Sequence, residues 1–202
     1  MPSLTKELAT LLRQGARGDA QRQEPRLRQL ISSLELATPA NLAAPQALEM
    51  LEGVWELRWS SSSQSYLRAV PWLENLQILA PSQGRAMNLL RFPGSFAGLG
   101  GIAVEASISI DVVGIDHSIT EATGPAHQRV QVRFERGGWR GPLLGKAQPQ
   151  WLLPLQQSFP AWLDITVLDA ELRLCRGNAG TLFALVRRSD LSIDQFLRQA
   201  RD

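Results

Sequence analysis

The sequence predicts a mainly β fold, an antiparallel β-barrel preceded by an N-terminal helical segment and followed by a short C-terminal helix. From residue 54 onward, apolar residues recur at every second position, as in strands that bury one face. About nine such short segments follow one another without long helices between them, which favours a barrel over a parallel sheet. The first fifty residues instead repeat apolar positions at helical spacing. We therefore expect a helical extension over residues 1–50 and a barrel with its terminal helix over residues 51–202.

Two leucine-rich segments predict the N-terminal helices. Their apolar positions are Leu4, Leu8, Leu11 and Leu12, then Leu27, Leu30, Ile31 and Leu34 after Pro25, a residue suited to the first turn of a helix. The second segment also gathers Arg17, Arg22, Arg26 and Arg28. These arginines are either a solvated polar face or a contact for anionic lipid or for a partner. At the other end of the chain, Ser192 and Gln195 have the spacing of a capping box, which predicts a terminal helix to roughly residue 200.

Alternation predicts the strands and the residues that face inward. The clearest strand covers residues 102–112, and others are expected at residues 54–60, 76–79, 86–92, 119–122, 130–135, 165–168, 172–175 and 182–187. Gly137 and Gly138 are expected to turn the chain, so that Trp139 begins the return strand. The apolar faces are expected to line the interior and to contact a ligand there. They contribute Trp55, Leu57, Trp59, Val104, Ile108, Val132 and Phe134.

Composition excludes several classes of function. The chain has 202 residues, a net charge of +2 and no Lys/Arg run interleaved with aromatics, which argues against a nucleic-acid partner. One cysteine excludes an internal disulfide, and no segment approaches the ~18 apolar residues of a membrane span. The first residues resemble neither a signal peptide nor a transit peptide. We therefore expect a cytoplasmic protein.

The inventory of catalytic groups is small. His117 and His127 have no acidic residue at metal-ligand spacing, so we expect no metal and no cofactor. Cys175 lies in a predicted strand and is expected to be a buried structural thiol. The glycine-rich residues 94–101 lack the Gly-Lys-Ser/Thr of a phosphate loop and are expected to form a flexible loop over the barrel mouth. Residues 92–99, 142–144 and 151–155 are apolar enough to be unrecognised strands, the rim of a cavity or a membrane contact.

Two motifs resemble a known family. A glycine two residues before a tryptophan, here Gly53 and Trp55, is a lipocalin-type signature, and the motif Leu51–Ser60 is similar to the opening motif of the plastid-lipid-associated, or fibrillin, proteins of plants and cyanobacteria. Residues 162–183, with aspartates ahead of an Arg-Gly turn, resemble the closing motif of that family. The resemblance covers about residues 48–188. Val167 and Asn178 depart from the family pattern, which has an aromatic and an acidic residue there.

The resemblance implies a lipocalin-like barrel that binds or carries a quinone, carotenoid or acyl lipid, without catalysis, at photosynthetic membranes. Because no transit peptide is seen, it favours a cyanobacterial-type member that contacts thylakoid lipid peripherally. It also raises the alternative that Asp164 or Asp169 holds the polar head of a ligand, whereas aspartates at strand ends usually satisfy turn amides. Two other classes stay open: an enzyme on the same barrel, such as a bilin chromophore lyase, and a structural or interaction protein whose barrel is filled.

The first and last strands are expected to be joined by a structural latch. An indole from the first strand of a closed barrel needs a group that caps its face, and a guanidinium can stack there and donate to free carbonyls. The expected members of the latch are Gly53, Trp55, Arg173, Arg176 and Gly177. One of the two arginines should lie over Trp55, with Arg187 as a less favoured candidate.

Overall fold

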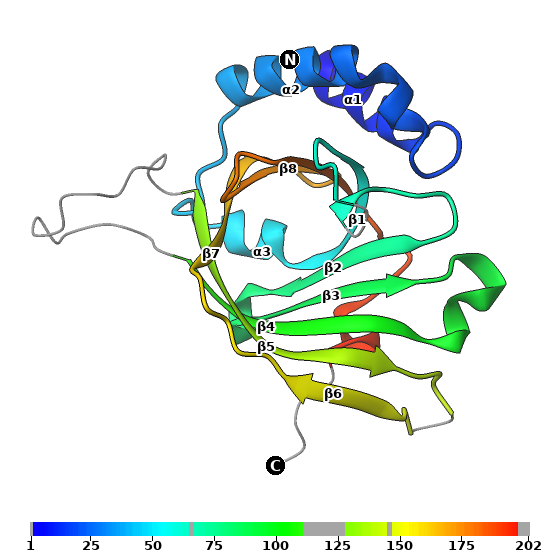
Figure 1. Cartoon of the computed structure of the whole chain (residues 1–202). Coiled ribbons are helices and arrows are strands. Elements are labelled where there is room, and N and C mark those ends of the chain that lie inside the picture. The colour runs from blue at the N-terminus through cyan, green and yellow to red at the C-terminus, as the bar shows by residue number, and fades with distance from the viewer. Residues whose placement is uncertain (1, 65–66, 111–127, 145–146, 198–202) are drawn as a thin grey trace, which may run out of the picture.

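Eight antiparallel strands close into a barrel in the computed structural model, which describes residues 2–64, 67–110, 128–144 and 147–197 (Figure 1). The strands are β1 (Gly53–Ser60), β2 (Glu74–Ala80), β3 (Arg85–Arg91), β4 (Gly101–Ile110), β5 (Arg129–Arg140), β7 (Ala161–Leu168), β8 (Leu172–Gly177) and β9 (Leu182–Arg187). They follow the order β4-β3-β2-β1-β9-β8-β7-β5, and pairing of β4 with β5 closes the ring. The additional strand β6 (Gln150–Pro154) pairs with β5 alone. The predicted fold class is confirmed; His117, His127 and the strand expected at 119–122 lie outside the described residues.

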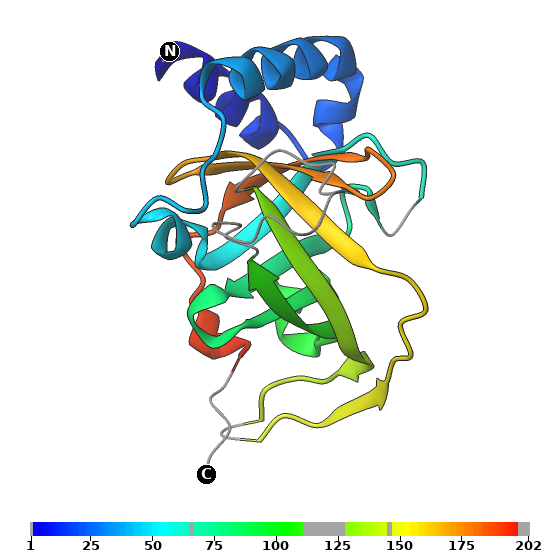
Figure 2. The ribbon, with the colours of Figure 1, turned by 90° about the vertical axis from the view of Figure 1, so that its left-hand side faces the viewer.

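Two helices form a layer over one side of the barrel, as Figure 2 shows. These are α1 (Pro2–Arg13) and α2 (Glu24–Ala37), whose apolar faces include Leu8, Leu12, Leu27 and Ile31. They form one buried cluster with residues on the outer faces of β1, β7, β8 and β9. The predicted helical spacing is therefore confirmed, and its apolar stripe covers the barrel wall.

Short helical turns occupy the other junctions. Helix α3 (Ala47–Leu51) packs Leu51 against Trp55 and Leu57 and lies at one end of the ring (Figure 1). The expected C-terminal helix is only a 3-10 turn, η5 (Ile193–Gln195), within the described residues. It begins with the expected capping box between Ser192 and Gln195.

A β-bulge corrects the predicted faces of β1. In the pairing with β9, Leu57 lies opposite Leu185 while Trp59 lies opposite Ala184, so Arg58 is an extra residue. A bulge shifts the side-chain alternation by one position. Trp59 is therefore buried on the outer wall, in the cluster under α1 and α2, and the prediction that it shares an inward face with Trp55 is wrong.

Two glycines expected to make a turn lie instead inside a strand. Gly137 and Gly138 pair with Leu153 and Leu152 in the β5–β6 ladder, and β5 continues to Arg140. Gly138 has a φ of +153°, and a Cβ there would overlap the carbonyl oxygen of Trp151. The glycine is required by close approach of a neighbouring strand rather than by a turn.

Candidate ligand-binding cavity

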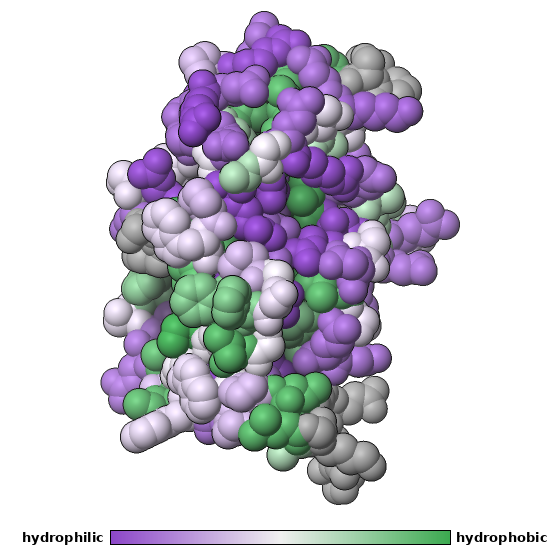
Figure 3. Space-filling view, turned by 90° about the vertical axis from the view of Figure 1, so that its right-hand side faces the viewer, coloured by the Kyte–Doolittle hydropathy of each residue, from purple (hydrophilic) through white to green (hydrophobic). Residues whose placement is uncertain are grey.

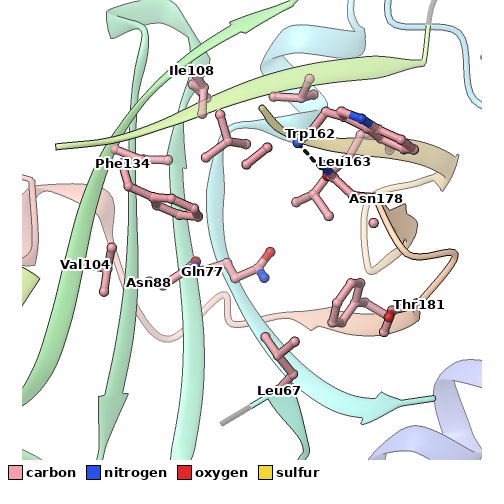
Figure 4. Close-up of a pocket in the computed structure, with 18 of the residues that line it drawn as sticks. Leu67, Gln77, Asn88, Val104, Ile108, Phe134, Trp162, Leu163, Asn178 and Thr181 are labelled. Carbon is pink, nitrogen blue, oxygen red and sulfur yellow. Dashed lines mark hydrogen bonds between the residues drawn. The ribbon is translucent and has the colours of Figure 1, made fainter. Parts of the chain in front are cut away.

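The barrel encloses a cavity of about 680 Å³. Of the inward-facing residues expected from the sequence, four line it: Val104, Ile108, Val132 and Phe134. Figure 4 shows Val104, Ile108 and Phe134 around the same space as Gln77, Asn88 and Leu163. Most of the remaining lining is also aliphatic or aromatic, and it includes Leu51, Leu67, Leu79, Ala86, Met87, Ala106, Val130, Ala161, Trp162, Ile165 and Phe183. The volume falls in the ~300–1,000 Å³ range usual for small-molecule sites.

The connections at one end of the barrel form the rim of the cavity. They are residues 61–64 after β1, residues 159–160 before β7, and residues 178–181 in the β8–β9 turn. Asn178 joins two of them, because its Oδ1 accepts from the Trp162 amide at 2.9 Å and its Nδ2 donates to the Pro160 carbonyl at 2.6 Å. This rim could not be predicted from the sequence, since polar loop residues have no periodicity that reveals which end of a barrel they close.

Arg173 lies at the other end of the same cavity. Alternation along β8 turns Arg173 and Cys175 inward and directs Leu172 and Leu174 to the cluster under the helices. The Arg173 side chain is 0% exposed, and its Nη2 donates a short hydrogen bond to Gln77 Oε1. Burial lowers the pKa of Arg173 below its ordinary value and raises the pKa of the neighbouring Cys175 thiol. Cys175 is a buried free thiol, as expected.

Two arginines lie over Trp55. The indole is fully buried and donates from Nε1 to the Leu51 carbonyl at 2.9 Å. The guanidinium carbons of Arg173 and Arg187 lie 5.2 Å and 4.2 Å from the centre of the Trp55 ring system. Arg187, the less favoured candidate from the sequence, is thus the closer of the two.

Arg187 also connects the barrel to its end turns. Its Nε donates to the Ala170 carbonyl at 2.6 Å, its Nη1 to the Glu52 carbonyl at 2.8 Å, and its Nη2 to the Met50 carbonyl. Gly53 has a φ of +144°, and a Cβ there would overlap Nη1 of Arg187. Glycine is therefore suited to this position on two grounds, its backbone conformation and the space that the guanidinium needs.

Arg176 lies apart from the latch. It follows the outward alternation of β8 and pairs with Glu35 of α2, with Nε–Oε1 at 2.9 Å and Nη2–Oε2 at 2.5 Å. Gly177, next in the strand, approaches the Phe183 ring, where a Cβ would be 3.3 Å from the ring edge. The expectation that Arg176 competes with Arg173 for Trp55 is wrong, because strand residues three positions apart point to opposite faces.

The two aspartates do not line the cavity. Asp164 is 5% exposed and accepts two hydrogen bonds from Arg129, at 2.8 and 2.9 Å, instead of pairing with an arginine of β8. Asp169 accepts from the Glu171 and Leu172 amides at 2.8 and 2.7 Å, which is the ordinary turn role. Trp55 and Leu57 face inward but are packed into the core beneath α3 rather than along the cavity wall. The positions of these four residues therefore do not favour the ligand contact that was expected for them.

A network of charges ties the helical segment to the outside of the barrel. Glu74 is 2% exposed and its carboxylate accepts from Arg17 and Arg188 at 2.7 and 2.8 Å and from Arg91 at 2.7 Å. Burial by itself would raise the pKa of Glu74, but hydrogen bonds from Arg188 and Arg91 outweigh it and lower that pKa. The second buried carboxylate, Glu56, shares Arg17 and Arg188 with it.

An exposed apolar surface lies away from the helices. Ile102, Trp139 and Trp151 are directly opposite one another across β4, β5 and β6, and they are 52%, 44% and 73% exposed. Phe96 and Leu99, in the 3-10 turn η4 (Gly94–Leu99), are also exposed. Figure 3 shows apolar side chains gathered on the lower half of this side of the molecule and polar ones over the upper half. Residues 94–101 do not line the main cavity, so they are not the loop over its mouth that the sequence suggested.

Of the comparisons with known proteins, the one with family models gives a match. No curated protein and no solved structure matches the chain significantly. Within the described residues, no helix combines the length and the apolar character needed to cross a bilayer. The PAP_fibrillin family model matches residues 3–186, a span that includes the N-terminal helices as well as the two motifs of the barrel. The chain therefore belongs to the PAP_fibrillin family.

Proposed function

We propose that this protein binds and carries a small hydrophobic molecule, without transforming it, inside the barrel. The observation that carries the proposal is the cavity of about 680 Å³ with a mostly aliphatic and aromatic lining. A barrel filled by its own side chains, the structural alternative, would leave no such space. A quinone, a carotenoid or an acyl lipid has the apolar area that this lining can bury, at ~25 cal/mol per Å². Family membership supports a lipid-associated role, and the resemblance of the two motifs favours a place at photosynthetic membranes.

The proposal is tested by identifying the bound molecule and then by blocking the cavity with a substitution. Protein purified from its own host is examined by native mass spectrometry and by organic extraction, which should recover a stoichiometric apolar molecule. Ala161→Trp places an indole at the cavity wall near the rim and should reduce the bound fraction at least tenfold. Ser109→Trp, on an exposed position of β4, is the matched control and should keep the ligand. Empty wild-type protein, or equal loading of both variants, would refute binding in the barrel.

Peripheral contact with a lipid surface is the second part of the proposal, and the exposed apolar surface favours it. Contiguous apolar patches of this kind often mark contact with a membrane or a partner. The basic residues near α2 favour it less, because Arg17, Arg22, Arg26 and Arg28 each pair with a carboxylate. We therefore assign the contact to the apolar surface and expect it to depend little on salt.

Liposome flotation tests the contact. A vesicle of thylakoid-like composition should float the wild-type protein, and the double variant Phe96→Ser, Trp151→Ser should lose most of the floated fraction. The matched control is Leu36→Ser, which changes an apolar side chain that is 87% exposed on α2, away from this surface. Equal flotation of the three proteins, or loss only at high salt, would show that the apolar surface is not the membrane contact.

A further inference from the structure

Arg173 is a charged group in an unusual position, since it lines the cavity while being fully buried. Among the described residues its Nε has no hydrogen-bond partner. Gln77, a neutral amide, accepts from its Nη2, and within the same residues the charged or titratable neighbours that affect it are the Cys175 thiol and the like-charged Arg187. The described part of the chain thus gives this guanidinium no carboxylate.

Such an arrangement is costly without a ligand. An ionised group in an apolar interior is destabilising unless it is paired and fully hydrogen-bonded. A guanidinium presents five N–H donors in a planar fork that matches a carboxylate or a phosphate. Two other buried ionic groups do have such partners: Asp164 pairs with Arg129, and Glu74 pairs with three arginines.

Polar groups near Arg173 are placed to complete a site for a head group. Gln77 and Asn88 line the same region of the cavity, and Figure 4 shows both side chains directed into it. The rest of the wall is mostly apolar and includes Phe134, Phe159 and Trp162, while polar loop residues close the rim. The cavity therefore combines one buried cation and neighbouring amides with a mostly apolar wall, which is the pattern required by an amphiphile with an anionic head.

We propose that the molecule bound in the barrel carries an anionic oxygen head, a carboxylate or a phosphate, which pairs with the Arg173 guanidinium while its apolar tail extends toward Trp162 and the rim. This proposal deepens the proposed function and rests on the cavity being a binding site. It selects acidic acyl lipids and prenyl or alkyl phosphates over neutral quinones and carotenoids.

Three probes with one tail separate the head group from the apolar contribution: dodecanoate, dodecyl phosphate and 1-dodecanol. Binding is measured by isothermal titration calorimetry at pH 7.5, below the critical micelle concentration of the two anionic probes and below the solubility limit of the alcohol. We expect wild-type protein to bind one or both anionic probes at least tenfold more tightly than the alcohol. The tighter of the two anions identifies whether the natural head is a carboxylate or a phosphate.

The variants test whether Arg173 is the cause. Arg173→Met keeps the aliphatic volume and should bring the anions down to the affinity of the alcohol, while Arg173→Lys should retain part of the preference. Arg133→Met, which removes an exposed arginine of β5, should behave as wild type. Equal affinity of the wild-type protein for the anions and the alcohol overturns the inference and leaves the carrier function standing. Because this comparison uses the wild-type protein alone, it tests the inference even if Arg173→Met does not fold. A preference that survives in Arg173→Met overturns it as well, whereas binding of none of the three probes refutes the proposed function itself.

Discussion

Replacing Arg187 with Met should destabilise the protein by about 2–4 kcal/mol. The variant loses three hydrogen bonds from a charged donor to the carbonyls of Met50, Glu52 and Ala170. Each is worth about 1 kcal/mol net after exchange with water, and stacking on a buried indole adds about 1 kcal/mol. Because the Arg187 side chain is only partly buried, water replaces some of these bonds and the lower half of the range is expected.

Urea unfolding at 25 °C, followed by far-ultraviolet circular dichroism, measures this loss. The far-ultraviolet signal is chosen because six tryptophans make fluorescence difficult to assign. Trp55→Ala should cost about 3–5 kcal/mol because it leaves a cavity in the core. In the double variant Trp55→Ala, Arg187→Met, the two changes should show a coupling free energy of about 1 kcal/mol. Arg133→Met is the control and should change stability by less than about 0.5 kcal/mol. An Arg187→Met effect as small as the control, or a coupling of zero, would refute the latch between the first and last strands.

Two further predictions concern the same wall of the barrel. Gly53→Ala should lower the free energy of unfolding by about 1–3 kcal/mol, because it adds a Cβ at a positive φ and against Arg187. Part of this loss should disappear when Arg187→Met is also present. A loss that is unchanged in the double variant would assign it to the backbone alone. Glu74 has a lowered pKa in the folded state, so its charge contributes stability that is present above its unfolded pKa, about 4.5, and is lost as the pH falls through the lower folded value. The stability difference between wild type and Glu74→Gln, measured by urea unfolding, should therefore be constant from about pH 6 to 8 and shrink below about pH 4.5. A difference that persists to pH 3 would show that the arginine contacts do not depend on the carboxylate charge.

The sequence by itself determined the fold class and most of the inward faces. Strict alternation in β4 and in the first half of β5 was enough to place Val104, Ile108, Val132 and Phe134 on the cavity wall, because the pleat of a strand leaves two faces only. The spacing of Leu8, Leu12, Leu27 and Ile31 likewise predicted the helices that cover the barrel. Local periodicity is sufficient wherever the chain is regular and one face is buried.

Only the tertiary structure decided what depends on irregular positions and on partners far apart in the chain. The bulge at Arg58 reverses the face of Trp59, and nothing in the residues 53–60 themselves indicates an inserted residue. Arg187 lies over Trp55 because β1 and β9 pair in one particular register, a contact across 132 positions that sequence spacing does not encode. Asp164 lies directly opposite both Arg129 of β5 and Arg176 of β8; it pairs with Arg129, while Arg176 pairs with Glu35 of α2. The cavity and its buried Arg173 have the same origin, since the space inside a barrel depends on how eight strands close and not on any one of them.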